Sequence, residues 1–531
     1  MCAVLTVAAS AGVAATSDAQ AAAPAGSAES GPGEPKQRFD VLEFQVEGNA
    51  SLDAETIERT VYPFLGPDRS IEDVEAARLA LEKAYRDRGY AATAVDVPPQ
   101  RVVDGVVVLK VVEARISRLR VVGARYFSQG RILETVPALA EGTVLNLPQV
   151  QEQIVEVNSS VDKRVTPLLR PGRDPGTTEV DLQVEDRLPL HGNVELHNNH
   201  APDTTAPRLV AGLRYGNLFQ REHAIGVQAI TSPEDTSEVR VLAGSYSLPL
   251  AGGTLLFSAL HSDSTTFVGS GIGVFGKGSI YGVRWFRPLL GDAPATELSH
   301  MVSLGVDYKD FNDNTRLGDG TSLVTPIHYA PLSLYYSGLR TDAKGTTEFG
   351  IGLTFALRGV ASDQQQFSDK RFQALSNFSI LKFNLGRTQK LPQDLSLYAR
   401  VDGQLTDKPL VSNEQYVAGG ADSVRGYLEA TQTGDSALHG TFELRSPDYS
   451  KLASALETMQ LRLFMDGAYL RQRVALPGTR DSFELLSTGL GLTVKAKGGF
   501  NLRSDVAWPL RDSGQQQAGR ARVHASAAYE F

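Results

Sequence analysis

The amino-acid sequence predicts a multidomain protein in which two small α+β domains precede a 16-stranded antiparallel transmembrane β-barrel. A β-α-α-β-β pattern occurs twice before residue 188, and short alternating segments fill the chain after it. An alternation of apolar and polar residues with a period of two is typical of β-strands. The length of 531 residues exceeds the usual size of one compact domain, which also indicates several domains.

Composition excludes several classes of protein. The net charge is −9 and no basic stripe offsets it, so a nucleic-acid partner is not expected. The single cysteine, Cys2, excludes an internal disulfide. No apolar run reaches the ~18–20 residues of a membrane-spanning helix, whereas a barrel strand needs only ~9–11. No nucleotide-binding fingerprint or metal-ligand cluster is visible, so we expect no cofactor, no metal ion and no catalytic residues.

The N-terminal residues have the composition of a secretory signal. Residues 3–16 are apolar, and Ala19-Gln20-Ala21 fits the small-x-small cleavage pattern, although a basic leader is missing. We therefore expect residues 1–21 to be a signal peptide whose true start lies upstream. Residues 22–38 are rich in Pro, Gly, Ser and Ala, which predicts a flexible linker.

Two copies of one small domain are predicted at 39–115 and 116–187. In the first copy, Ser70 and Asp73 form a candidate capping box for a helix that ends at Gly89. The sequence around Gly48 recurs around Gly123, at an offset of 75 residues. In the second copy we expect helices at 128–136 and 147–168 and a strand at 178–185. The shared order of elements favours a true repeat over two unrelated domains.

Residues 188–531 are predicted to form the barrel. We expect no helix in this region and sixteen strands, since an even number of strands is typical of these barrels. The expected strands begin near residues 192, 207, 223, 237, 253, 276, 297, 325, 346, 371, 394, 437, 459, 483, 498 and 521.

Strand parity predicts which side chains face the lumen. From Met459 onward, aliphatic residues alternate with Gln460, Arg462, Phe464 and Asp466, so Phe464 and Asp466 point inward if the aliphatic face meets lipid. His439 is also expected to face the lumen, in a solvated role. The inward set is strongly charged, and the core of a soluble β-sandwich would not tolerate it. It also includes Ser396, Tyr398, Arg400, Asp402, Gln404, Asn501, Arg503 and Asp505.

A long loop between the strands near 394 and 437 carries Val424-Arg425-Gly426-Tyr427, preceded by Gly419-Gly420. This segment resembles the sixth-loop motif of two-partner secretion transporters, the TpsB proteins within the outer-membrane insertase superfamily. Phe464-x-Asp466 resembles the second motif of that family, Phe-x-Asp-x-Gly. The sequence departs from it at Gly467-Ala468, where the family has glycine second after the aspartate.

The resemblance covers nearly the whole mature chain, and it implies both location and function. The two repeats would be periplasmic POTRA domains, and the barrel would lie in the outer membrane of a Gram-negative cell, in contact with lipid after insertion by the barrel assembly machinery. The protein would recognise the N-terminal secretion domain of one large partner exoprotein, of the haemolysin, haemagglutinin or adhesin type, and export it unfolded. Relatives can carry an N-terminal helix that plugs the barrel, but the prolines and glycines of 22–37 argue against one here.

The resemblance and strand parity together predict one specific contact: Arg425 returns into the lumen on its loop and pairs with Asp466. Arginine can bind a carboxylate through two parallel hydrogen bonds, which lysine cannot do. Gly426 would let the backbone pass the wall, and Tyr427 and Phe464 would shield the pair from water.

Three other functions compete with export. An insertase of the same superfamily shares the loop motif but usually has more POTRA domains. A passive porin would not need two domains in front of its barrel. A barrel enzyme would need a nucleophile and a base within hydrogen-bond reach, and no such set is apparent in the sequence.

Overall fold

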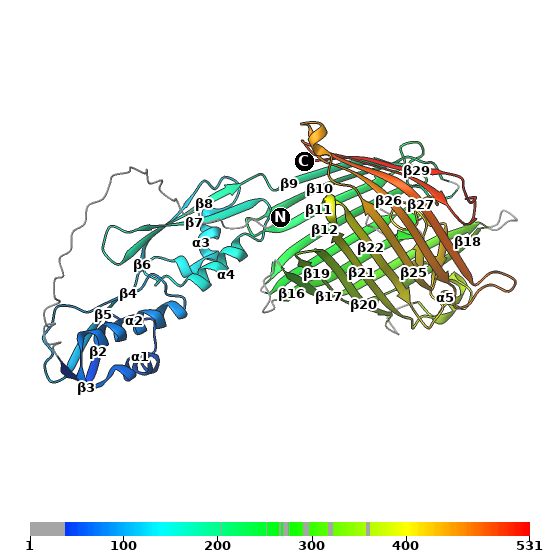
Figure 1. Cartoon of the computed structure of the whole chain (residues 1–531). Helices are drawn as coiled ribbons and strands as arrows, with labels where there is room; N and C mark the ends of the chain where they lie inside the picture. The colour runs from blue at the N-terminus through cyan, green and yellow to red at the C-terminus, as the bar shows by residue number, and fades with distance from the viewer. Residues whose placement is uncertain are drawn as a thin grey trace. The chain divides into compact units, whose positions relative to one another are not determined.

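The computed structural model describes residues 38–531 except 203, 251, 265–266, 269–273, 276, 290–296, 317–321 and 357–361. The predicted signal peptide, the linker up to residue 37 and its expected lack of a plug helix lie outside the described residues. The chain divides after Leu188 into two compact units. Figure 1 shows the helices α1–α4 in the first unit and the large strand assembly in the second.

The first half of the N-terminal unit is a three-stranded sheet covered by helices. Its elements, with η denoting a 3-10 helix, are β1 (Phe39–Val41), β2 (Glu43–Glu47), α1 (Ala54–Val61), η1 (Tyr62–Phe64), β3 (Gly66–Arg69), α2 (Ile71–Asp87), β4 (Ala94–Asp96) and β5 (Val106–Val112). The sheet has the order β2-β5-β4, with β2 parallel to β5. Helix α2 begins with the predicted capping box of Ser70 and Asp73 and buries Val74, Ala77, Leu81 and Tyr85.

Charged side chains tie the two helices of this half together at the surface. Asp53 caps α1 by accepting a hydrogen bond from the Thr56 amide, and it pairs with Arg88, which follows α2. The hydrogen bonds from Arg88 and Thr56 hold the pKa of the Asp53 carboxyl well below its usual range.

The second half repeats this arrangement. Its elements are β6 (Arg115–Val122), α3 (Gln129–Thr135), η2 (Pro137–Leu139), α4 (Leu147–Val157), β7 (Lys163–Pro171) and β8 (Thr177–Asp186), with β6 parallel to β8 in the order β6-β8-β7. The helix expected at 147–168 is wrong beyond Val157. The Asn158 side chain accepts a hydrogen bond from the Val165 amide and donates one to its carbonyl, which reverses the chain into strand β7.

Two glycines show that the repeat is structural. Gly48 follows β2 and Gly123 follows β6, and both have left-handed backbones, with φ of 84° and 94°. A Cβ on Gly48 would lie 2.3 Å from the carbonyl oxygen of Val111, and one on Gly123 would lie 2.5 Å from that of Val184. Each glycine therefore lets the chain turn closely over the central strand of its sheet.

Alanine at Gly123 is expected to destabilise the second repeat far more than alanine at Gly142. Both positions have φ near +90°, which costs a residue with a Cβ about 1–2 kcal/mol. Only Gly123 also places the Cβ against a backbone carbonyl, which adds about 1–3 kcal/mol, because nothing lies within 4 Å of a Cβ on Gly142. Urea unfolding of a fragment spanning 38–188 measures both values, and equal losses at the two positions would contradict the argument.

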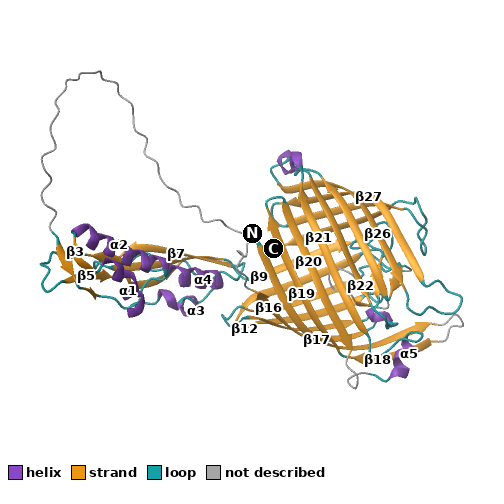
Figure 2. Cartoon of the chain, turned by 60° about the horizontal axis from the view of Figure 1, so that its bottom comes forward, coloured by secondary structure: helices purple, strands orange, loops and turns teal. Residues whose placement is uncertain are grey.

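The second unit is a closed antiparallel barrel, drawn as the ring of tilted orange strands in Figure 2. Its strands are β9 (Leu190–His197), β10 (Arg208–Leu218), β11 (His223–Thr231), β12 (Arg240–Leu250), β13 (Gly253–Ser262), β16 (Gly278–Leu289), β17 (Leu298–Arg316), β18 (Ser322–Tyr329), β19 (Pro331–Asp342), β20 (Gly345–Ala356), β21 (Ser379–Lys390), β22 (Ser396–Leu405), β25 (Ser436–Arg445), β26 (Leu456–Arg471), β27 (Ser482–Ala496), β28 (Phe500–Pro509) and β29 (Arg522–Glu530).

The seventeen named segments make sixteen barrel strands, as the sequence predicts. Strands β18 and β19 pair with successive parts of β17 in one register, with Tyr329 opposite Lys309 and Leu332 opposite Val306. They are one barrel strand interrupted at Ala330. Pairing of β29 with β9 closes the ring.

The predicted parity of the strands is confirmed on β26. Leu461, Leu463 and Met465 are about half exposed on the outer face, while Phe464 and Asp466 are buried inside. Aliphatic side chains outside and ionised ones inside are the arrangement expected of a barrel in lipid. No helix in the described part of the chain is long and apolar enough to cross a bilayer.

Connecting segments hold the remaining elements: β14 (Phe267–Val268), β15 (Val274–Phe275), α5 (Gln364–Lys370), η3 (Pro392–Asp394), η4 (Ser412–Glu414), β23 (Tyr416–Ala418), β24 (Gln432–Gly434) and η5 (Ser450–Leu452). The expectation of no helix after residue 188 is wrong, because Asp363 and Gln366 form a capping box that starts α5. The strand expected near 371 consequently begins at Ser379.

Candidate functional site

The loop between β22 and β25 returns into the barrel. Strands β23 and β24 pair as a short hairpin, and the tip that they carry holds the predicted motif. At this tip Val424, Arg425 and Tyr427 are at most 2 % exposed. Their partners lie within strands of the barrel wall, so the tip lies inside the lumen.

Arg425 meets Asp466, as the sequence predicts. The Arg425 Nε donates to Asp466 Oδ2 at 2.7 Å, and Nη2 donates to Oδ1 at 2.8 Å, so the pair is bidentate. The Arg425 amide also donates to Oδ2 at 3.2 Å, and the Thr441 hydroxyl donates to Oδ1 at 2.9 Å. The Asp466 carboxylate is fully buried and bonded by four donors, which stabilises its charge.

Two further carboxylates complete the surroundings of the guanidinium. Arg425 Nη1 lies 2.8 Å from Glu443 Oε1 and 3.8 Å from Asp505 Oδ1. The sequence analysis did not assign these roles to Glu443 and Asp505. The alternation along their strands turns both side chains toward the lumen, and this could have indicated them. Arg445 pairs with Glu443, and Arg462 and Arg503 pair with Asp505.

The network therefore alternates in charge, and its wall residues come from three strands, β25, β26 and β28. A buried ion pair is weak evidence for stability, because the cost of desolvation can exceed the Coulomb attraction. It does disfavour any position of the loop tip that leaves one of the buried charges without its partner. We interpret the network as a device that specifies where the loop tip docks.

The other motif residues fix the tip to the wall. The Gly426 amide donates to His524 Nε2 at 2.9 Å, and a Cβ on Gly426 would lie 3.2 Å from both Ala507 Cβ and Pro509 Cδ. The Tyr427 hydroxyl lies 3.0 Å from the carbonyl oxygen of Leu486 and 2.8 Å from that of Arg511.

Aromatic and aliphatic contacts surround these polar ones. The Phe464 ring stacks on the Arg425 guanidinium, whose Cζ lies 3.5 Å from the ring centroid, and thus shields the ion pair as expected. Tyr427, expected in the same shielding role, directs its hydroxyl to the wall instead. Val424 packs in an apolar cluster with Ala418, Tyr427, Ala437, Ala468, Leu470 and Leu485.

His439 does not have the solvated role expected for it. It is 4 % exposed, and its ring nitrogens lie 3.0 Å from Asp402 Oδ1 and 3.1 Å from the carbonyl oxygen of Ser423. The inward direction is correct, but the returning loop buries the ring. His439 thus joins the loop to strand β22.

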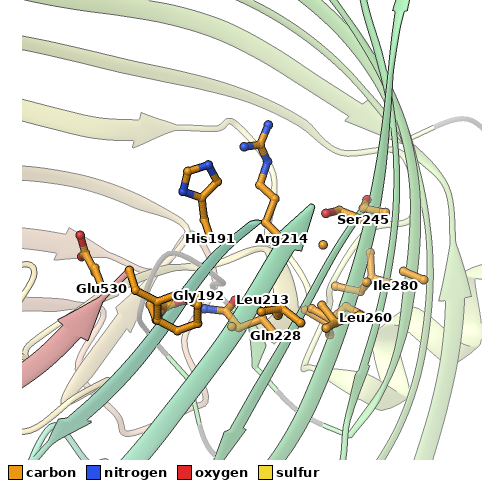
Figure 3. A pocket seen from close by; sticks show the side chains of 18 residues that line it. His191, Gly192, Leu213, Arg214, Gln228, Ser245, Leu260, Ile280 and Glu530 are labelled. Carbon is orange, nitrogen blue, oxygen red and sulfur yellow. The ribbon is translucent and has the colours of Figure 1, made fainter. Parts of the chain in front are cut away.

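Open space remains along the wall formed by the first barrel strands. A cavity of about 720 Å³ is lined by strands β9 to β16 and the end of the chain, and Figure 3 shows His191, Arg214, Gln228 and Ser245 among its side chains. The lining residues that face inward on these strands are mostly small, which keeps this part of the lumen wide: Gly212, Gly226, Ala243, Ser245 and Ser258. A second cavity of about 570 Å³ lies between the loop and the wall near Lys309 and Arg400.

No group of three or more His, Cys, Asp or Glu side chains in the described residues is arranged to hold a metal ion.

The fold and this loop define a class: outer-membrane β-barrel transport proteins with periplasmic POTRA domains. Within that class, residues 176–494 match the family model of the haemolysin secretion/activation proteins ShlB/FhaC/HecB, and residues 39–114 match the ShlB-type POTRA domain. The chain belongs to the ShlB/FhaC/HecB family, the outer-membrane transporters of two-partner secretion. Its barrel lies in the outer membrane and its POTRA domains in the periplasm.

Individual relatives are distant. The chain is 21 % identical to the heme/hemopexin transporter protein HuxB of Haemophilus influenzae, over 89 % of this chain and 84 % of HuxB. It is 21 % identical to the outer membrane transporter CdiB of Dickeya dadantii, over 84 % of this chain and 78 % of CdiB.

Two solved structures share the fold. CdiB from Escherichia coli matches with a TM-score of 0.64 at 20 % identity, over 95 % of this chain and 93 % of that one. BamA from Haemophilus ducreyi lacking POTRA domains 1–3 matches with a TM-score of 0.56 at 14 % identity, over 93 % of this chain and all of that one.

Proposed function

We propose that this transporter recognises one large secreted partner protein through its POTRA domains and exports it unfolded through the barrel. The observation that carries the proposal is the loop tip held inside the lumen by Arg425, Asp466 and Glu443, while the wall of β9 to β16 keeps a cavity of about 720 Å³. The cargo would be of the haemolysin, haemagglutinin or adhesin type, as in the family. Insertion of the barrel itself would depend on the barrel assembly machinery.

Domain boundaries follow from the same proposal. We propose a first POTRA domain at 39–115, a second at 116–187 and the barrel from 188 onward. The two POTRA cores are separate clusters, one around Leu81 and Tyr85 and the other around Ile132 and Val180.

Cargo would bind a sheet edge of the POTRA domains by adding a strand. An edge strand recognises a partner strand through unpaired N–H and C=O groups. Strand β7 is a poor edge because Pro167 and Pro171 lack N–H groups, and β6 is partly covered, since the Ile116 amide donates to the Thr143 carbonyl. In the first sheet, β2 with five residues offers a longer edge than β4 with three, so β2 is the best candidate.

A fragment spanning 38–188 is expected to fold alone and to retain the N-terminal domain of the cargo on an affinity column. The cargo is to be sought among the products of adjacent genes, and the same cargo without its N-terminal domain is the matched control. In cells, an excess of the fragment in the periplasm should compete with the transporter and reduce export. A folded fragment that retains no adjacent-gene product would contradict the recognition step.

A further inference from the structure

A second segment, residues 362–378, which we call the lid, packs on inward-facing strand residues at one end of the barrel. It contains α5 and lies between strands β20 and β21. Figures 1 and 2 both place α5 beside β18 at the barrel end away from the chain's C-terminus. Because strand β9 enters from the periplasmic side and the loops after odd-numbered barrel strands lie opposite, this end is extracellular.

The inner face of the lid is apolar and fully buried. Phe367 and Phe378 have no or almost no exposed surface, and their rings lie 5.7 and 6.0 Å from that of Tyr329. The cluster joins inward-facing strand residues to the base of the returning loop: Phe311, Ile327, Tyr329, Phe367, Ala374, Phe378, Ile380, Leu410 and Val411. The lid therefore descends into the mouth of the barrel.

Directly below this cluster the lumen becomes polar. The Tyr329 hydroxyl donates to Glu414 Oε1 at 2.7 Å, and Lys309 pairs with the same carboxylate. Glu414 and Lys309 also line the cavity of about 570 Å³. The Tyr329 hydroxyl thus joins the buried apolar cluster of the lid to the polar lumenal cavity.

One ion pair holds the lid to two other loops. Arg371, just after α5, donates from Nη1 to Asp435 Oδ1 at 2.9 Å and from Nη2 to Oδ2 at 3.0 Å. Asp435 is fully buried at the return of the motif loop, and it also accepts from the amides of Leu410 at 3.0 Å and Arg473 at 2.7 Å. Arg371 further donates to the carbonyl oxygens of Leu410 and Val474. Three extracellular loops therefore meet at this pair.

We propose that residues 362–378 form an extracellular gate that is latched by Arg371 and Asp435 and must lift before a chain can leave the lumen. The latch is separate from the Arg425 network, which involves other side chains deeper in the barrel. A bidentate pair buried among three loops favours one closed position strongly, because lifting the lid separates the Arg371 guanidinium from the Asp435 carboxylate. The gate concerns opening of the pore and does not depend on which cargo is recognised.

Conductance of the full-length protein in planar bilayers tests the latch without cargo. Arg371→Met removes the charge and keeps much of the side-chain length, and Arg480→Met is the matched control at an exposed arginine of the loop that contains Val474. We expect Arg371→Met to raise the open probability about tenfold or more and the control to leave it unchanged. Folded barrels migrate faster than unfolded ones on unheated gels, which verifies assembly. An assembled Arg371→Met barrel with wild-type conductance would overturn the proposal.

A disulfide tests whether the lid must move during export. The Leu375 amide donates to the Pro409 carbonyl at 3.0 Å, so cysteines at these two positions are close enough to be joined. In a Cys2→Ser background, the oxidised Leu375→Cys, Pro409→Cys protein should stop export and keep the low conductance, and a reductant should restore export. Normal export by the fully oxidised protein would overturn the gate, whereas a reduced protein that exports normally shows that the substitutions themselves are harmless.

Discussion

Replacing Arg425 by alanine is expected to reduce export about tenfold or more while leaving an assembled barrel. The substitution leaves Asp466, Glu443 and Asp505 facing one another without the guanidinium that lies between them. Breaking a buried pair by removing one partner costs about 3–5 kcal/mol, which is enough to displace the loop tip from its dock. Secreted cargo per assembled transporter is the quantity to measure.

Two variants and a control sharpen this prediction. Arg425→Lys keeps the charge but cannot reproduce the bidentate contact, so we expect a large loss there as well. The double variant of Arg425→Ala with Asp466→Ala should lose little more than either single variant, because each single change already breaks the same contact. Arg480→Ala, at an exposed arginine of the loop between β26 and β27, should export normally. Full export by assembled Arg425→Ala would remove the basis for a functional role of the motif.

Replacing Gly426 by valine is expected to have an effect of similar size, for a steric reason. Gly426 has φ of 93°, and the cost of this conformation for a residue with a Cβ is about 1–2 kcal/mol. The new side chain would also press against Ala507 and Pro509 on strand β28, 3.2 Å from the Cβ position. The tip would then be displaced, together with its hydrogen bond to His524.

Gly478 offers a matched control for the backbone effect alone. It has φ of 80°, and nothing lies within 4 Å of a Cβ built there. Gly478→Val should therefore leave export unchanged, while Gly426→Ala should fall between Gly426→Val and the wild type. If Gly426→Val exports as well as Gly478→Val, the close approach of the tip to the wall has no role in export.

The substitutions of Arg425 and Gly426 act on the loop tip inside the lumen. The latch of Arg371 and Asp435 acts on the lid at the extracellular end. The motif loop takes part in both, since its tip carries Arg425 and its return carries Asp435. A movement of this loop would therefore change both the contacts of Arg425 and those of Asp435. Measuring conductance and export on the same variants separates the role of the loop tip from that of the latch, because conductance needs no cargo.

Local patterns in the sequence were sufficient for the architecture. Period-two alternation is a property of a single strand, so it predicts the sixteen barrel strands and the inward direction of Phe464 and Asp466 without knowledge of the partners. The recurrence of the sequence around Gly48 at Gly123 likewise predicts two related domains. Errors arose where a local pattern was ambiguous, as in the helix continued past Val157, or too short to stand out, as in α5.

The pairing of Arg425 with Asp466 could be anticipated because two motifs and one parity argument converge on it. The charges that complete the site could not, since Glu443 and Asp505 belong to strands whose distance from the loop tip depends on how the barrel closes. The lid is an extreme case: Arg371 and Asp435 are 64 residues apart, and neither lies in a recognisable motif. The strands, their faces and the repeated domains can be predicted from the sequence because they follow from local periodicity. Which loops return into the lumen, and which charges meet there, depends on the folded barrel, because a loop can place its residues in many positions until the wall offers partners for them.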